Sequence, residues 1–180
     1  MLSAPPRTRK IVFWKAERMS SRREARERAM QAVYAYTVGG DDAEHVVDTV
    51  IQVQLGSDEE AKKFATKLFL RTLDLKDEAD EIVARYTKNW ELSRIALIDR
   101  ILLRIAICEM LRFEDIPPKV TINEAIEVAK RYSTNKSGQF INGILDAILL
   151  DFQKDGRLKK SGRGLVGMDT ILDRSDSEEK

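Results

Sequence analysis

"RILLRIAICEMLRFEDIPPKVTINEAIEVAKRY", residues 100–132, joins the most hydrophobic segment of the chain to the break that follows it. Apolar residues recur at helical spacing in its first half and cover most of the circumference, which predicts a central helix surrounded by others. The Pro117-Pro118 pair ends that helix, because proline lacks the amide hydrogen that a helix interior needs. Thr121 and Glu124, three residues apart, predict a capping box at the next helix start.

Working outward, the same helical period recurs along the chain, and no strand-like alternation is bounded by turn residues. The sequence therefore predicts an all-α fold of about seven helices. The expected helices cover residues 21–38, 41–55, 57–75, 76–90, 91–113, 121–132 and 139–152, with 76–90 either separate or a continuation of its predecessor.

Cap residues set the expected ends of two of these helices. Ser20 or Ser21 is the expected N-cap of the first, which stops at the Gly39-Gly40 pair. Ser57 and the acid three residues after it predict a capping box at the start of the third.

The length of 180 residues favours one domain with tails. Residues 1–20 lack clear periodicity and are expected to be an extension, either disordered or the product of a misassigned start. Residues 21–153 form the helical domain. Residues 154–180 are rich in glycine and polar residues, so the sequence predicts a disordered C-terminal tail.

Composition narrows the class of protein. The chain has 31 Lys and Arg against 30 Asp and Glu, so any electrostatic argument about nucleic acid must be local. Cys108 is the single cysteine, which excludes a disulfide framework and favours a reducing compartment. Without a secretion signal or an apolar run long enough to span a bilayer, we expect a soluble, cytoplasmic protein with no membrane partner.

The sequence contains no recognisable catalytic or metal-binding motif. His45 is the only histidine, and neither zinc-ligand spacing nor a glycine-rich phosphate loop occurs. Cys108 lies among apolar residues, where we expect a buried small hydrophobe rather than a nucleophile. We therefore expect no enzyme activity, no metal and no cofactor.

The stretch "SRREARERAMQAVYAY", residues 21–36, carries arginines at one end and core residues at the other. On a helical wheel, Arg22 lies on the line of the apolar stripe and Arg26 beside it, so we expect this end to project past the core and display its arginines. Cations are disfavoured at a helix N-terminus, which favours a polyanion partner. The alternative is a solvated end that is neutralised by Glu24 and Glu27.

Three blocks resemble the NusB family of transcription antitermination factors: "RREARERAMQAVYAY", the stretch at 100–132, and "SGQFINGILDAIL". The resemblance spans about residues 21–152. It implies two packed helical bundles and binding to the boxA element of nascent ribosomal RNA leader transcripts. It also implies a heterodimer with NusE, a small-subunit ribosomal protein, within the RNA polymerase antitermination complex. Some free relatives form homodimers.

The resemblance also implies site residues. The expected RNA-binding residues are Arg22, Arg23, Arg26, Tyr34, Arg104, Lys136, Ser137, Phe140 and Asn142. Asp99 and Arg100 are the expected contacts of the NusE partner. We expect the arginine patch to lie next to the loop before Phe140, so that one polynucleotide contacts both.

Several of these residues have a second interpretation. Arg104 either contacts phosphate or forms an ion pair with Glu109 or the preceding helix. Phe140 either stacks on a base or packs in the core. Gly143 indicates the close approach of another helix or of the RNA backbone, and we favour the helix contact. Asp99 is expected to emerge at the surface, as a solitary charge or a partner contact.

Tyr34 is expected at the edge of the helical core, with its hydroxyl in water.

Two other functions are alternatives to an RNA-binding factor. One is a helical protein-interaction module without RNA binding. The other is an RNA-modifying enzyme, which the absence of a glycine-rich α/β segment disfavours. Affinity that falls steeply with salt would identify RNA binding.

Overall fold

The computed structural model describes residues 9–87 and 91–168, which contain seven α-helices and no strand. The α-helices are α1 (Arg9–Gly39), α2 (Ala43–Val46), α3 (Glu59–Asp74), α4 (Lys76–Tyr86), α5 (Leu97–Arg112), α6 (Pro118–Tyr132) and α7 (Ser137–Lys154). A π-helix, η1 (Val47–Gln52), follows α2, and two 3₁₀ turns are η2 (Leu92–Arg94) and η3 (Gly162–Leu165). The all-α prediction is confirmed. Within the described ranges, no helix is long and apolar enough to cross a membrane.

Helix α5 is the centre of the fold, as its apolar circumference predicted. Every residue from 101 to 110 is buried, and α1, α3, α4, α6 and α7 all pack against this helix. Burial on all sides explains why polar residues are rare along α5. The few charged groups it carries therefore need partners on neighbouring helices.

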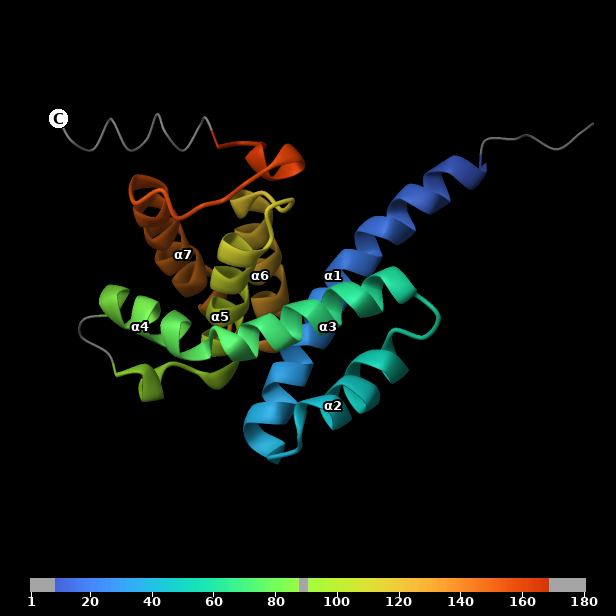
Figure 1. The fold of residues 1–180 in the computed structure, drawn as a ribbon, viewed down its shortest axis with the longest axis horizontal. Helices are drawn as coiled ribbons and strands as arrows, with labels where there is room; N and C mark the ends of the chain where they lie inside the picture. The colour runs from blue at the N-terminus through green and yellow to red at the C-terminus, as the bar shows by residue number, and fades with distance from the viewer. Residues whose placement is uncertain (1–8, 88–90, 169–180) are drawn as a thin grey trace, which may run out of the picture.

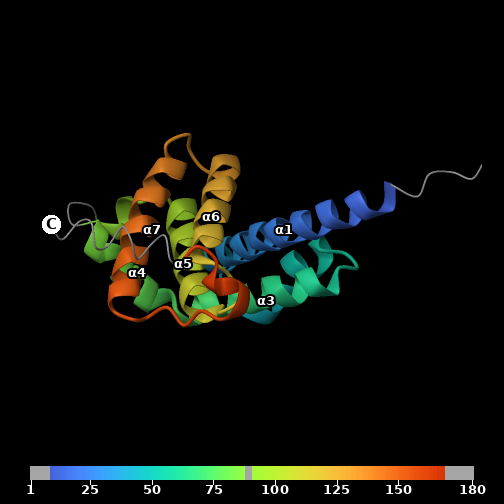
Figure 2. The ribbon, with the colours of Figure 1, turned by 90° about the horizontal axis from the view of Figure 1, so that it is seen from above.

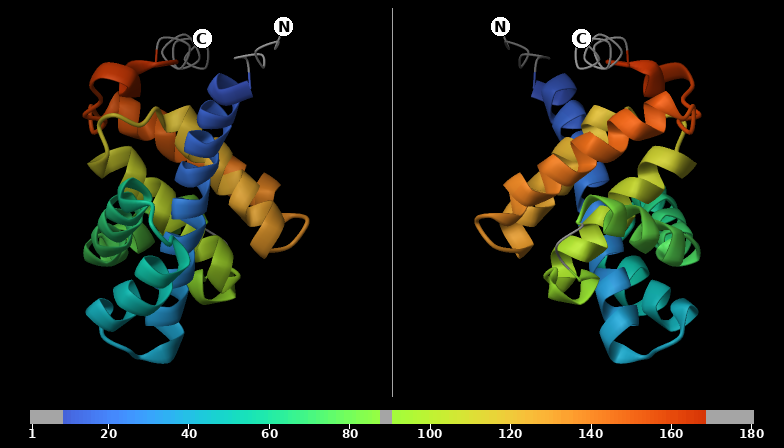
Figure 3. Two further views of the ribbon diagram at one scale, coloured as in Figure 1. Left: turned by 90° about the vertical axis from the view of Figure 1, so that its right-hand side faces the viewer. Right: turned by 90° about the vertical axis from the view of Figure 1, so that its left-hand side faces the viewer.

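The helices form two groups that α1 connects (Figure 1). Helices α2 and α3 pack with the C-terminal half of α1, while α4, α6 and α7 pack around α5. Viewed from the side, α1 crosses the α6–α7 pair, and a short loop joins these two antiparallel helices (Figure 3). The N-terminal part of α1 extends past the other helices (Figure 2).

Three helix starts differ from the predicted ones. Helix α1 begins at Arg9, so Ser20 and Ser21 lie inside it rather than at its cap. Helix α3 begins after Asp58, one residue beyond the predicted cap Ser57, and the Asp58 carboxylate accepts the Ala61 amide at 2.9 Å. The predicted capping box therefore marked the correct turn at the start of α3, but the capping residue is Asp58 and not Ser57.

Helix α6 begins at Pro118 rather than near Thr121. Proline fits the first helical position, because its missing N–H would have no intrahelical acceptor there. The prediction at residues 41–55 also needs correction, since α2 has only four residues before the π-helical turn η1.

Part of the predicted disordered tail is packed against the domain. Residues 155–168, here called the C-terminal strap, run back across the end of α5 (Figure 1). The Lys160 Nζ donates to the carbonyls of Glu109 and Phe113 at 3.2 and 2.7 Å. These carbonyls also accept the backbone amides of Phe113 and Ile116, so Lys160 adds a second donor to each at the end of α5. The Ser161 amide donates to the Glu114 carbonyl at 3.0 Å. Residues 169–180 of the predicted tail lie outside the described ranges.

Gly164 is the residue that lets the strap approach so closely. A Cβ at this position would lie 1.8 Å from the Glu114 carbonyl oxygen, so only glycine fits. The glycines that suggested disorder in the sequence include one that a close contact requires.

Candidate nucleic-acid interface

Two of the three predicted arginines of α1 lie at the surface. The Arg22 Nη2 is 3.2 Å from Glu60 of α3, and Arg23 binds Glu124 of α6 through two hydrogen bonds of 3.0 and 2.8 Å. The Arg23 side chain is 48% exposed. Its hydrogen bond to Glu124 raises the pKa of Arg23. These arginines are displayed, as predicted, but each is already paired with a carboxylate.

Arg26 is not displayed, and the prediction that its side chain is exposed was wrong. Its side chain is only 8% exposed, and its Nε donates at 2.8 Å to Glu109, which lies on the central helix α5 and is 1% exposed. The ring of Phe64 lies 5.3 Å from the Arg26 guanidinium carbon. Helices α3, α5 and α6 surround this turn of α1, so the arginine stripe enters the core one turn earlier than the helical wheel suggested.

Glu27 joins the next turn of α1 to the end of α6. Its carboxylate accepts hydrogen bonds from Arg131 at 2.9 and 3.0 Å and from the Tyr132 hydroxyl at 3.0 Å. The alternative in which Glu24 and Glu27 neutralise the helix start holds in part, since Glu24 binds Arg28 at 3.3 Å. Glu27 instead neutralises Arg131, whose side chain remains 66% exposed.

Arg131 is a surface cation that was not among the predicted site residues. The available signal was the Lys130-Arg131 pair at the end of α6, which leads directly into the loop before the predicted site residues. Lys130 is also exposed and binds Glu127 at 2.6 Å. The arginines of α1 thus share their surface with cations of α6.

Asp99 holds the α6–α7 loop and does not emerge at the surface. It is 6% exposed in the first turn of α5. Its carboxylate accepts the Ser133 and Ser137 hydroxyls at 2.6 and 2.7 Å, and the Ser137 oxygen accepts the Thr134 amide at 3.2 Å. The predicted exposure of Asp99 was wrong, because the loop closes over it. Lys136, in the same loop, is exposed.

The residues after this loop keep part of their predicted character. Phe140 is half-buried and packs against the core cluster. The Asn142 amide donates to Asp146 at 2.9 Å. Gly143 is exposed, and an added Cβ would meet nothing within 4 Å, so the predicted close helix contact is wrong. Tyr34 is 41% exposed, at the edge where it was expected.

Arg104 and Arg100 belong to the interior side of α5. Arg104 is 4% exposed and donates from Nε and Nη2 to Asp80 of α4 at 2.6 and 2.7 Å. Of the two interpretations of Arg104, the ion pair with the preceding helix is the one present. Arg100 is half-buried and donates to the Leu92 carbonyl at 3.3 Å.

Helix α6 connects the arginine end of α1 to the α6–α7 loop. Glu124 binds Arg23 at the middle of α6, Tyr132 binds Glu27 at its end, and Lys136 follows in the loop. At a rise of about 1.5 Å per residue, Glu124 and Tyr132 are about 12 Å apart along α6. This surface, called here the α1–α6 edge, comprises Arg22, Arg23, Arg131 and Lys136.

The remaining candidate groups have no site around them. Cys108 is buried, and burial raises the pKa of its thiol to about 11. His45 is exposed on α2. In the described part of the chain, no group of three or more acidic, histidine or cysteine residues could hold a metal ion.

Comparisons with known proteins agree on one family. The NusB family matches residues 23–150. The transcription antitermination protein NusB of Salinibacter ruber is 54% identical over 159 residues, covering 88% of this chain and 99% of that protein.

Solved structures show the same fold. T. maritima NusB is 37% identical, with a TM-score of 0.65 over 71% of this chain and 89% of that one. A chain from the crystal structure of antitermination factors NusB and NusE in complex with dsRNA is 24% identical, with a TM-score of 0.65 over 72% of this chain and 96% of that one. From the central α5, the α6 block that follows it and these matches, we conclude that the chain belongs to the NusB family.

Proposed function

We propose that this protein is a transcription antitermination factor. It binds boxA-type single-stranded RNA of nascent ribosomal RNA leader transcripts together with NusE, and supports processive transcription of ribosomal RNA operons. The observation that carries the proposal is the α1–α6 edge, where Arg22, Arg23 and Arg131 share one surface with the loop that holds Lys136.

The ion pairs at this edge suit exchange with RNA. Exposed pairs contribute only about 0–1 kcal/mol, so a phosphate can replace a carboxylate at small cost. Arg23 already presents the fork that binds Glu124 through two bonds, and the same geometry fits a phosphate. Such contacts position the backbone, while half-buried Phe140 and the neighbouring Asn142 lie where unstacked bases would be read.

Asp99 and Ser137 act through the loop in this proposal. Their hydrogen bond fixes the start of α7 against α5, which keeps Lys136 in place. The predicted direct partner contact of Asp99 becomes an indirect one, because its carboxylate is buried. The NusB–NusE complex with dsRNA noted above supports a joint surface of the two proteins.

A second candidate function is a helical protein-interaction module that does not bind RNA. It is favoured by the carboxylates Glu60, Glu124 and Glu27, which neutralise the cations of the α1–α6 edge. In both candidates the protein acts by binding rather than catalysis.

We further propose that the protein works in the cytoplasm within the RNA polymerase antitermination complex, and that the free protein forms a homodimer.

Titration of a fluorescent boxA oligonucleotide, with and without NusE, tests RNA binding. The variant Arg22→Ala/Arg23→Ala should bind the RNA on the order of tenfold more weakly, because two phosphate contacts are lost. The plot of log affinity against log salt should become shallower by about 1.4, which is two contacts at about 0.7 each.

The matched control is Arg85→Ala/Lys154→Ala. It removes two exposed cations from α4 and α7, far from the α1–α6 edge, and it should bind like the wild type. Wild-type protein that binds NusE but shows no salt-dependent RNA affinity would favour the interaction module instead.

A further inference from the structure

We propose that a second cationic surface, the α3 ridge, binds the phosphate backbone of the RNA that flanks the segment at the α1–α6 edge. The ridge comprises Lys63, Lys67 and Arg71 of α3 with Arg112 at the end of α5 and Lys159 of the C-terminal strap. This inference rests on the proposed function and extends its binding surface.

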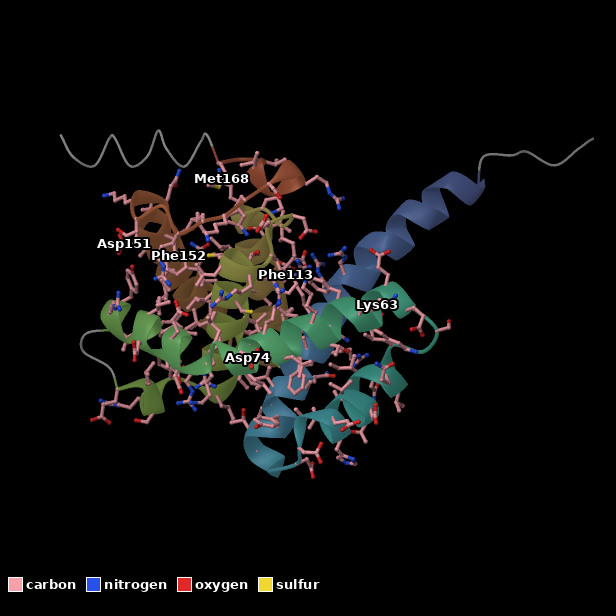
Figure 4. The ribbon with its side chains drawn as sticks, viewed as in Figure 1. Lys63, Asp74, Phe113, Asp151, Phe152 and Met168 are labelled. Atoms are coloured by element: carbon pink, nitrogen blue, oxygen red, sulfur yellow. The ribbon has the colours of Figure 1, made fainter. Side chains whose placement is uncertain are left out.

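The three ridge cations of α3 line up because they are four residues apart. Residues at this spacing lie on one face of a helix, and the row from Lys63 to Arg71 extends about 12 Å at about 1.5 Å per residue. In Figure 4, Lys63 lies near the start of α3, and Phe113 lies beside the same helix farther along. A row of regularly spaced cations matches a polymer of regularly spaced phosphates.

Buried aromatic rings lie beneath the ridge. The Lys67 Nζ is 5.1 Å and the Arg71 guanidinium carbon 5.4 Å from the centre of the Phe113 ring, which is 4% exposed. Contact with the ring face holds both cations in place. Their charge therefore stays at the surface, over an apolar layer that screens it poorly.

The ridge continues into a hollow of about 480 Å³ at the end of α5. Arg71, Arg112 and Lys159 line it together with Asp74 and Glu114. The hydroxyl of Ser161 donates to the Glu114 carboxylate at 3.4 Å, and the Arg71 Nη1 donates to the Arg112 carbonyl. Arg112 also lies 3.9 Å from Glu78, outside the lining, so the hollow adds Arg71 and Lys159 to the ridge as cations without a carboxylate partner.

The ridge cations differ from the arginines of α1 in how often a carboxylate pairs with them. Every arginine from Arg22 to Arg28 has a carboxylate within 3.3 Å. Among residues 22–87 and 91–168, whose side chains are described, no carboxylate pairs with Lys63, Lys67 or Lys159. Arg71 uses its guanidinium on the Arg112 carbonyl, and the Arg112 Nη2 lies 3.9 Å from the Glu78 carboxylate. Neighbouring cations without counter-charges repel one another, and a bound polyanion relieves that repulsion.

The ridge is continuous with the α1–α6 edge, which identifies RNA as its occupant. The Arg22 guanidinium carbon lies 4.6 Å from the Phe64 ring centre, and Phe64 packs edge-on against Phe113 at 5.7 Å. Arg22 is one of the cations of the α1–α6 edge. It also contacts Phe64, whose neighbour Phe113 lies beneath the ridge cations. A strand leaving the edge at Arg22 meets Lys67 next.

RNA length provides the test. A short boxA oligonucleotide fills the α1–α6 edge, and a longer one adds transcript flanks on both sides. Lys67→Ala/Lys159→Ala should weaken binding of the long RNA on the order of tenfold at low salt, and should lower its salt slope by about 1.4. The short RNA should bind this variant and the wild type equally well.

The control variant is again Arg85→Ala/Lys154→Ala, which removes the same net charge from exposed positions that also have no carboxylate partner in the described chain. Equal thermal melts establish that both variants fold. Unchanged affinity for the long RNA, or the same loss in the control, overturns the ridge while leaving the proposed function intact. Wild-type protein that binds neither RNA overturns both.

Discussion

An arginine–glutamate ion pair occurs both at the α1–α6 edge and at the interface between α1 and α5, with different consequences. Arg23 binds Glu124 at 2.8 Å with 48% of its side chain exposed, and Arg26 binds Glu109 at 2.8 Å with 8% exposed. The distances are equal, so length does not separate a binding residue from a structural one. Burial does, because only the exposed arginine can exchange its carboxylate for another anion.

The largest expected effect comes from breaking the buried pair. Arg26→Ala leaves the Glu109 carboxylate uncompensated in the core, so the free energy of unfolding should fall by about 3–5 kcal/mol. Urea titration followed by circular dichroism measures this loss. An Arg26 variant is for this reason a poor probe of RNA binding, since weaker binding would reflect unfolding.

Arg23→Ala is the matched control. Its exposed pair should contribute less than about 1 kcal/mol to stability, although its loss should weaken RNA binding. Replacing Arg26 by Met together with Glu109 by Leu should recover much of the stability lost in Arg26→Ala, because no buried charge remains. If Arg26→Ala and Arg23→Ala unfold at the same urea concentration, burial is not the distinction that we infer.

An intermediate effect is expected at Asp99, where a buried carboxylate organises the loop. Asp99→Ala leaves the Ser133 and Ser137 hydroxyls without their acceptor, which should lower the free energy of unfolding by about 1–3 kcal/mol. Amide hydrogen exchange should become faster at Thr134, whose N–H donates to Ser137. Unchanged exchange in a folded Asp99→Ala protein would show that the loop does not depend on this residue.

The smallest effect concerns pH and the C-terminal strap. Burial lowers the pKa of Lys160 from 10.5 to about 8. Between these values the unfolded chain binds more protons than the folded one, so this residue makes stability rise with pH from about 8 to 10.5. Below pH 8 the contribution is constant, because Lys160 is protonated in both states.

Lys160→Gln should lack this rise. Thermal melts of the wild type and the variant across pH 7–10.5 give the difference in melting temperature at each pH. Burial also raises the pKa of Cys108 above its usual value of 9.0, which makes stability fall with pH in both proteins. That opposite slope cancels when the two proteins are compared. A difference that is flat with pH would mean that the strap does not bury this amine.

The sequence was most informative where the signal is local. Helical periodicity predicted the central α5, and the Pro117-Pro118 pair predicted the break after it, because both depend on a few neighbouring residues. Helix starts were less accurate, as at Arg9 and Pro118, since a helix continues wherever nothing stops it. The three sequence blocks shared with the NusB family predicted the fold family because they too are local patterns of neighbouring residues.

The candidate site was predicted less well, because a helical wheel shows which side of a helix is polar but not what covers it. Arg26 and Asp99 were expected at the surface, and each is buried by a helix or loop distant along the chain. Arg104 had two interpretations in the sequence, and only the fold shows that its partner is Asp80. Arg131 and the cations of α3 are visible as sequence patterns, but their exposure and their ion pairing depend on residues of other helices.

The sequence by itself determined an all-α protein of the NusB family, since apolar spacing and helix breaks act within a few turns. Only the tertiary structure decided which cations reach solvent, which carboxylates neutralise them, and that the strap lies against Glu114. Burial and charge pairing depend on segments that fold together from distant parts of the chain, and desolvation then determines which charges stabilise the core and which remain free to bind.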